Sequence, residues 1–178
     1  TSDGNIRCWG DNSKSQLDDV PSDSTFHPDP HIAIACGLYH SIALTQEGFI
    51  NYWPMEDPNT DPHHHFDRHE DMSNAPQEDG YIAIACGYYH NVALKNDGTI
   101  KCWIAEKIPE EVGRERVQRA LSDSPTDNGY IMIACGGYHS VALKNDGTIE
   151  CWGDNTHGQC DRQPYDYGYI MIACGSYH

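Results

Sequence analysis

The chain has 178 residues, and 27 acidic against 11 basic residues give it a formal net charge of −16. This charge excludes a general nucleic-acid binder, because neutralising phosphates needs a basic surface, and it argues against docking on anionic lipid. No apolar run approaches the roughly 20 residues of a membrane-spanning helix, and the 11 tyrosines and four tryptophans are too many for a disordered acidic chain. The length suffices for one domain with a core, or for part of a larger one.

Two short motifs repeat in phase along the chain. The first reads IMIACGGYHSVAL in its clearest form and has four copies (residues 32–44, 82–94, 131–143 and, shortened, 170–178). The second reads KNDGTIECWGDN and also has four copies (residues 1–12, 95–103, 144–155 and, more weakly, 45–53). Cysteines of the first motif are spaced by 50, 49 and 39 residues. Periods of this length are typical of propeller blades.

Each unit is predicted to form a short three-stranded meander. The run Ile-Ala-Ile-Ala-Cys is apolar throughout, so we expect a strand buried on both faces. Ser-Val-Ala-Leu is the second strand, and Asn-Asp-Gly marks a tight hairpin turn, because glycine accepts a positive φ without a Cβ clash. Thr-Ile-x-Cys-Trp, rich in β-branched and aromatic residues, is the third strand. One such meander cannot cover its own apolar faces, so several must stack.

The first insertion, residues 53–80, is rich in proline and aspartate and contains PHHHFDRHED at residues 62–71. Imidazole and carboxylate groups suit zinc, nickel or copper. Because no strand or helix pattern fixes ligand geometry here, we expect a solvated loop, with neither a metal site nor another cofactor. Metal binding and a pH-sensitive contact are the alternatives.

The second insertion, residues 104–129, replaces the Gly-Asp-Asn segment that otherwise follows the motif tryptophan. Residues 110–121 predict a short helix, with Pro109 near its start and acidic residues in its first turn. An apolar stripe would run along it, although Gly113 is unfavourable (Val112, Val117, Ala120 and Leu121). Four of the 11 basic residues lie in this insertion and are the candidate partner-binding residues (Lys107, Arg114, Arg116 and Arg119). We expect a helix docked on a blade, with its arginines either solvated or contacting a partner.

One histidine and one tryptophan recur at the same place in each unit (His40, His90, His139 and His178; Trp9, Trp53, Trp103 and Trp152). A ring of identical histidines is one way to build a central metal site. We favour a structural role, because every copy occupies the same slot and a catalytic group is usually needed once. Each imidazole is then expected to tie its turn to the backbone by a hydrogen bond.

The eight cysteines do not predict a simple disulfide framework. Motif cysteines fall on the first and third strands of a unit, about 9.6 Å apart across the middle strand, whereas a disulfide needs Cα atoms within about 7 Å. We therefore expect the motif cysteines to act as small buried apolar residues. Tyr52, which occupies a third-strand cysteine position, supports this interpretation. Disulfide pairing between blades remains an alternative. Cys160 lies outside the pattern and is a candidate free, exposed thiol. Cysteine usage favours a reducing, intracellular compartment, or a virion-like assembly, over secretion.

Residues 134–159, ACGGYHSVALKNDGTIECWGDNTHGQ, resemble the regulator of chromosome condensation repeat, which combines Gly-x-x-His-x-x-x-Leu with Asp-Gly, Trp-Gly and Gly-Gln. The resemblance covers nearly the whole chain outside the two insertions. It implies an all-β fold of propeller blades with one short inserted helix, from a family of seven-bladed discs with about 50 residues per repeat. Residues 1–178 are then a single propeller region of about four repeats, the first and last units being partial (residues 1–30, 31–80, 81–129, 130–168 and 169–178).

The partial units are compatible with three architectures. Joined end to end, they lack the counterpart of residues 140–143, the second strand of a meander. The chain is either about half of a longer disc, or a four-repeat ring closed by its own ends, or one copy in an assembly whose members complete one another's blades. An open half-disc exposes strand edges and an apolar face, through which copies could self-associate.

The sequence contains no catalytic motif: it lacks a phosphate-binding glycine loop, a Gly-x-Ser-x-Gly elbow and His-Glu-x-x-His. We therefore predict a non-enzymatic scaffold that presents its inserted loops to a protein partner. One alternative is a structural component of a large capsid-like or fibre-like assembly. Another, by family analogy, is a guanine nucleotide exchange factor for a small GTPase, although neither insertion has the β-hairpin pattern of an inserting wedge.

Overall fold

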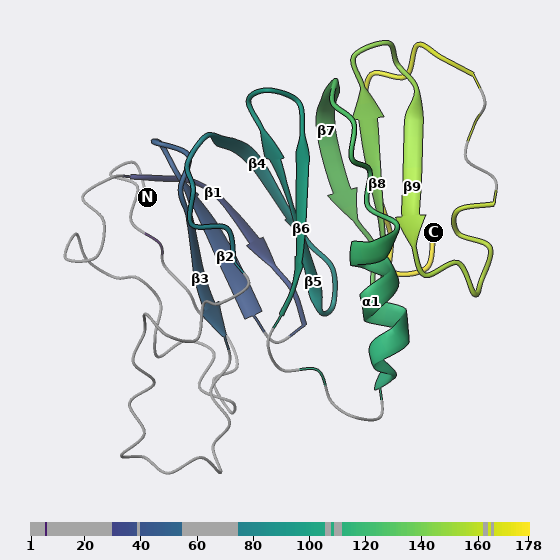
Figure 1. Ribbon diagram of the computed structural model, residues 1–178, viewed down its shortest axis with the longest axis horizontal. Coiled ribbons are helices and arrows are strands. Elements are labelled where there is room, and N and C mark those ends of the chain that lie inside the picture. Colours follow the sequence, from purple (N-terminus) through teal and green to yellow (C-terminus); the bar gives the residue numbers. More distant parts are fainter. Residues whose placement is uncertain are drawn as a thin grey trace.

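Three antiparallel sheets, each with three strands in chain order, make up most of the described part of the chain (Figure 1). The computed structural model describes residues 6, 30–38, 40–54, 75–105, 108, 112–161, 164 and 166–178. The first sheet contains β1 (His31–Cys36), β2 (His40–Thr45) and β3 (Ile50–Pro54), and the second β4 (Tyr81–Cys86), β5 (His90–Lys95) and β6 (Ile100–Ile104). Helix α1 (Arg114–Ser122) precedes the third, which contains β7 (Tyr130–Cys135), β8 (His139–Lys144) and β9 (Ile149–Gly153). The predicted fold of propeller blades with one short helix is confirmed.

The three sheets share one register, as their sequence repeats predict. First and second strands pair antiparallel with a bulge, so that the pairing skips Ile32, Ile82 and Ile131. Second and third strands pair without a register shift. At the turn between β5 and β6, Gly98 has a φ of 80°, and the Asp97 carboxylate accepts hydrogen bonds from the backbone N–H and the hydroxyl of Thr99 at 2.9 and 2.6 Å. The predicted hairpin turn is therefore confirmed.

Burial is greatest in the middle strand of each sheet and not in the first. Nearly every residue of β2 and β5 is buried. In the first strands, Ile32, Ile82 and Ile131 keep 59%, 54% and 51% of their surface exposed. The prediction that first strands are buried on both faces is thus wrong. Each first strand forms an edge of its sheet, whereas each middle strand is flanked on both sides within the sheet.

Apolar side chains of neighbouring sheets pack together between the blades. Leu44 of β2 and Tyr81 of β4 belong to one cluster, and the equivalent Leu94 of β5 and Tyr130 of β7 belong to the next. All four side chains are at most 2% exposed. Burying a side chain of this size contributes about 1.5–3 kcal/mol. The blades are therefore held together by the same contact, repeated from one boundary to the next.

A second contact between blades, from a third-strand Ile to a middle-strand Ala, has a counterpart before the first sheet. Ile50 of β3 shares a cluster with Ala93 in the next blade. Ile6, which occupies the same place in the second motif, is 6% exposed and packs with Ala43 of β2. Residue 6 therefore lies where the third strand of a preceding blade would pack.

Backbone hydrogen bonds join all four copies of the first motif. Leu38 N donates to Tyr88 O at 3.2 Å, Tyr88 N to Gly137 O at 2.8 Å, and Gly137 N to Ser176 O at 3.0 Å. Residues 166–175 belong to none of the described sheets. The described chain thus contains three complete blades and the beginning of a fourth unit. Its helix α1, with nine residues, is too short to cross a membrane.

Candidate interaction surface

Helix α1 connects two blades, because it follows β6 and lies against β9 (Figure 1). It begins at Arg114 and not at residue 110 as predicted. The preceding Gly113 has a φ of 76°, a left-handed conformation that an α-helix cannot contain. Val117 and Ala120 are fully buried, in agreement with the predicted stripe, whereas Leu121 is half-buried. Residues 109–111 lie outside the described part of the chain.

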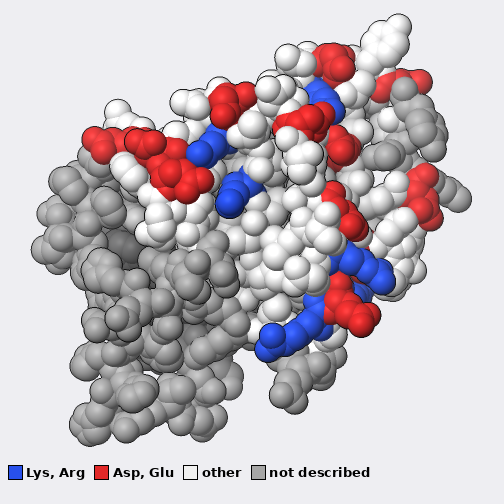
Figure 2. Space-filling view, viewed as in Figure 1, with Lys and Arg blue, Asp and Glu red and all other residues white. Residues whose placement is uncertain are grey.

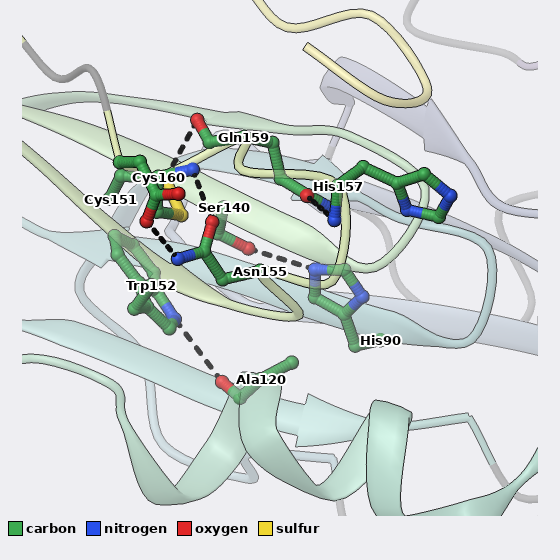
Figure 3. The surroundings of a disulfide bond; sticks show 10 residues. His90, Ala120, Ser140, Cys151, Trp152, Asn155, His157, Gln159 and Cys160 are labelled. Atoms are coloured by element: carbon green, nitrogen blue, oxygen red, sulfur yellow. Dashed lines mark hydrogen bonds between the residues drawn. A yellow bond between two sulfur atoms is a disulfide. The ribbon is translucent and has the colours of Figure 1, made fainter.

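Trp152 of β9 anchors the end of the helix. Its indole N–H donates a hydrogen bond of 3.2 Å to the backbone oxygen of Ala120, and its ring is 4% exposed (Figure 3). The last four carbonyls of a helix have no partner within the helix. The motif tryptophan therefore both fills the blade and satisfies one of these carbonyls.

A buried ion pair holds the first half of α1. The guanidinium of Arg116 donates twice to Asp154 Oδ2, from Nε at 3.0 Å and from Nη2 at 2.6 Å, and the Thr156 hydroxyl donates to the same oxygen at 2.9 Å. The Asp154 side chain is 0% exposed, and that of Arg116 is 33% exposed. The guanidinium also lies 4.3 Å from the centre of the Tyr138 ring, and Arg119 Nη1 lies 3.7 Å from Asp154 Oδ1.

These contacts keep Asp154 charged. Burial raises the pKa of its carboxyl group, but the hydrogen bonds from Arg116 and Thr156 and the positive charge of Arg116 lower the pKa more. The pKa therefore lies below its ordinary value, and the ion pair persists at neutral pH. Arg116, one of the candidate partner-binding residues, directs its charge into the molecule.

The loop after β9 is closed by a disulfide between Cys151 and Cys160 (Figure 3). The prediction of a free thiol at Cys160 is therefore wrong. The strand-spacing argument excludes pairs within a meander, but Cys160 lies beyond the meander, in a loop that returns to β9 and brings the two Cα atoms to 5.4 Å. The Asn155 side chain accepts a hydrogen bond from Cys160 N at 2.8 Å and donates one to Asp161 at 2.5 Å. The loop that carries Asp154 is thus tied at both ends.

Two of the candidate arginines are exposed on α1, although Arg119 also lies beside Asp154. Arg114 and Arg119 are exposed, and with Glu115, Gln118 and Ser122 they line a shallow hollow of about 400 Å³. Figure 2 shows basic side chains gathered over the helix, next to acidic ones. Lys107 lies outside the described residues. The structure therefore divides the basic set. Arg116 braces the helix, Arg119 is exposed but also lies beside Asp154, and Arg114 is exposed.

The motif histidines join consecutive blades. His40 Nε2 lies 2.7 Å from Asn91 Oδ1, and His90 Nε2 lies 2.8 Å from Ser140 Oγ. An amide oxygen only accepts, so His40 carries its proton on Nε2 and donates. These partners are side chains of the next blade, and His90 and His139 each also have a backbone hydrogen bond with the next motif histidine. The imidazole ring of His90 packs closely on the turn before it. A Cβ on residue 87 would lie 2.1 Å from His90 Cε1, so only glycine fits at this position.

A metal site is not assembled by the residues that the structure describes, since no three His, Cys, Asp or Glu side chains among them are placed to hold an ion. The motif cysteines of the four units line a common hollow with the glycines that follow them (Cys36, Cys86, Cys135 and Cys174). Burial raises the pKa of the Cys174 thiol to about 11. The His-rich stretch of residues 62–71 and Trp9 lie outside the described part, as does the side chain of Trp53.

Comparison with known sequences supports the interpretation of the repeats. The profile of the regulator of chromosome condensation (RCC1) repeat matches residues 81–103 and 133–159. Two segments of the chain therefore match this repeat. The first match covers β4, β5 and nearly all of β6, and the second runs from β7 into the loop after β9, ending just before Cys160. No curated protein matches the sequence significantly.

Solved structures with the same fold include plant receptor ectodomains and a yeast protein. The ectodomain of receptor kinase CR4 from Physcomitrella patens is 19% identical, with a TM-score of 0.71 over 99% of this chain and 43% of that chain. The CRINKLY WD40 ectodomain of ACR4 from Arabidopsis thaliana is 21% identical, with a TM-score of 0.60 over 86% and 45%. Prp20p of Saccharomyces cerevisiae is 17% identical, with a TM-score of 0.51 over 88% and 43%. This repeat-containing chain thus spans less than half the length of each.

Sequence reasoning missed Asp154 as the organising residue of the surface. Its only signal is the Trp-Gly-Asp-Asn segment that ends the second motif, which resembles an ordinary turn. The second repeat replaces this segment, and Ala105 N donates to Tyr89 O at 2.8 Å just as Asp154 N donates to Tyr138 O at 2.9 Å. The insertion of the second blade therefore begins at the position equivalent to Asp154 in the third blade.

Proposed function

We propose that the chain is part of a non-catalytic propeller scaffold that binds a protein partner through the outer face of α1. The observation that carries the proposal is the attachment of α1: contacts with Trp152 and Asp154 fix the helix, while Arg114 stays exposed. A helix held in this way loses little conformational freedom when it binds, which favours affinity.

The charge of this face indicates the chemistry of the partner. The chain carries a net charge of −16, so exposed arginines on α1 are a local exception. Guanidinium groups bind carboxylates in a bidentate geometry and are enriched in interfaces. We therefore expect an acidic segment of the partner to lie across α1.

A protein partner is also in keeping with the relatives. Prp20p binds Gsp1p and histones, so a propeller with this fold is able to bind proteins of different kinds. The residues of α1 come from an insertion between strands, and inserted segments on a rigid scaffold frequently carry function.

Charge reversal on α1 tests the proposal. The variant Arg114→Glu should bind the partner about tenfold more weakly or worse, because it repels an acidic segment. The measurement is quantitative mass spectrometry of proteins captured on the immobilised chain from an extract of cells that produce it, followed by affinity measurement with the purified partner.

A matched control uses a basic residue away from α1. Lys101 of β6 is exposed, and Lys101→Glu makes a comparable change of charge outside the helix. It should leave capture unchanged. Loss of the same proteins with Lys101→Glu, or their retention by Arg114→Glu, would show that α1 is not the interaction surface.

A further inference from the structure

The residues that hold α1 on the third blade lie within one cross-linked segment. The disulfide closes residues 151–160, and both Trp152 and Asp154 lie inside this ring (Figure 3 shows the disulfide next to Trp152). Trp152 binds the backbone oxygen of Ala120, and Asp154 binds the guanidinium of Arg116. The cross-link and the attachment of the helix therefore belong to the same segment.

The two attachment points are held in different ways. Trp152 is part of β9 and pairs with Ser140 of β8, so the sheet fixes its position. Asp154 follows the strand, and its buried carboxylate accepts a hydrogen bond of 2.9 Å from the Thr156 hydroxyl. Thr156 lies between the two linked cysteines, so the disulfide keeps it against this carboxylate. Burial of the ion pair thus depends on the loop, whereas Trp152 depends on the sheet.

The hydrogen bonds of the loop itself are local. Gly158 N donates to Asn155 O at 3.0 Å, and the Asn155 side chain bonds to Cys160 N and Asp161. Such bonds shape the turn without attaching it to β9. Asn155 and Thr156 are exposed to solvent, and Cys160 is half-buried. The disulfide is therefore the covalent link between the far end of the turn and the strand, at a place that a soluble thiol can reach.

The cross-link is not a general requirement of the repeat. Residues 8–17 read CWGDNSKSQL and residues 151–160 read CWGDNTHGQC, so Leu17 stands at the place of Cys160. In the second unit, Cys102 stands at the place of Cys151, and the insertion that carries α1 replaces the loop. The cysteine pair thus belongs to the unit on which α1 lies.

Two neighbouring thiols do not compete with this link. Cys102 and Cys135 pack against the same apolar cluster as Trp152. Burial raises the pKa of the Cys102 thiol to about 12, and it also raises the pKa of Cys135. The thiolate is the form that attacks a disulfide, so both thiols remain unreactive at neutral pH.

We propose that the Cys151–Cys160 disulfide is a redox-sensitive switch for α1, opened by a soluble thiol reductant. A thiolate of the reductant attacks one sulfur of the link, and a second reductant thiol resolves the mixed disulfide. The S–S bond breaks, both cysteines become thiols, and the reductant becomes a disulfide, so two electrons and two protons reach the protein. Thr156 then leaves the Asp154 carboxylate, and water reaches the ion pair with Arg116.

Hydration weakens the attachment of α1 at Arg116. An ion pair that water reaches contributes little to stability, whereas the bond from Trp152 to Ala120 stays in place because the sheet holds Trp152. The helix therefore loosens without leaving the blade. Weaker partner binding by the reduced chain is a consequence that rests on the proposed function, but the loosening of α1 does not.

Hydrogen exchange before and after treatment with dithiothreitol tests the proposal without a partner. Mass spectrometry follows the peptide that contains residues 114–122, whose amides should exchange at least about fivefold faster after reduction. Exchange in β5, which lies in another blade, should not change. The variant carrying Cys151→Ser and Cys160→Ser should show the faster exchange of α1 with and without dithiothreitol.

Two arginine variants show whether the effect passes through Asp154. Arg116→Met lacks the ion pair, so its helix should already exchange fast, and reduction should add little. Arg114→Met keeps the ion pair and should keep the full response. Equal exchange of α1 in the oxidised and reduced chains, an equal response of the two variants, or faster exchange in β5 as well would each overturn the proposal. Because no partner is present, these outcomes are separate from those that test the proposed function.

Discussion

At the scale of single residues, the buried motif histidines are held in the neutral form. Burial, together with the neighbouring His40 and His139, lowers the pKa of His90 to about 4. Its hydrogen bond to Ser140 links the second blade to the third. Protonation of this ring would place a positive charge between packed blades, so the link is sensitive to acid.

This burial predicts a pH dependence of folding. The unfolded chain binds a proton at His90 near pH 6.5, whereas the folded chain binds it only near pH 4. The stability contributed by the neutral ring is therefore complete above pH 6.5 and is lost as the pH falls towards 4, by up to about 3 kcal/mol. Urea unfolding at a series of pH values measures this loss.

The matched pair of variants is His90→Gln and His157→Gln. His157 is exposed, so its replacement should preserve the slope of stability against pH. His90→Gln removes the titrating ring and should flatten the slope between pH 6.5 and 4. An unchanged slope in His90→Gln would contradict the assignment.

At the scale of elements, α1 depends on the charge of Arg116. Arg116→Met keeps the side-chain stem but leaves the buried Asp154 carboxylate without its principal partner. Because the guanidinium is one-third exposed, the cost is expected to be about 2 kcal/mol, below that of a fully buried pair. Arg114→Met, on the exposed face of the same helix, should change the stability by less than about 0.5 kcal/mol. Equal effects of the two substitutions in urea unfolding would refute the bracing role of Arg116.

The loop after β9 depends on its disulfide. Replacing Cys151 and Cys160 by Ser should lower the free energy of unfolding by about 2–3 kcal/mol, because the cross-link restricts the unfolded chain. Peptide mapping without reductant should find the two cysteines linked. Alkylation of both before reduction would show that the link does not form.

At the scale of the whole molecule, the repeats determined what the sequence could predict. Strands, hairpin turns and the stacking of blades follow from short motifs that occur several times, because each copy supports the others. The pairs Arg116–Asp154 and Cys151–Cys160 did not follow. Arg116 comes from an insertion with no second copy, and Cys160 from a loop whose return to β9 is not encoded in any periodic pattern.

The exposure of the first strands shows a second limit of sequence reasoning. An apolar run has the same appearance whether its neighbours cover it or not. Ile32 and Ile82 lie at bulges on an edge strand, and more than half of each side chain faces away from the packed blades. Composition predicted burial, whereas position in the sheet decided it.

We propose that the partner binds the exposed face of α1, and site-specific photo-crosslinking tests this proposal most directly. A photoreactive residue at Gln118, exposed on that face, should link the chain to the partner in the cells that produce it, and the same group at Asp97, exposed on a distant hairpin turn, should not. Addition of Arg114→Glu should strongly reduce the Gln118 product. Equal products from both positions, or a product only from Asp97, would contradict the account.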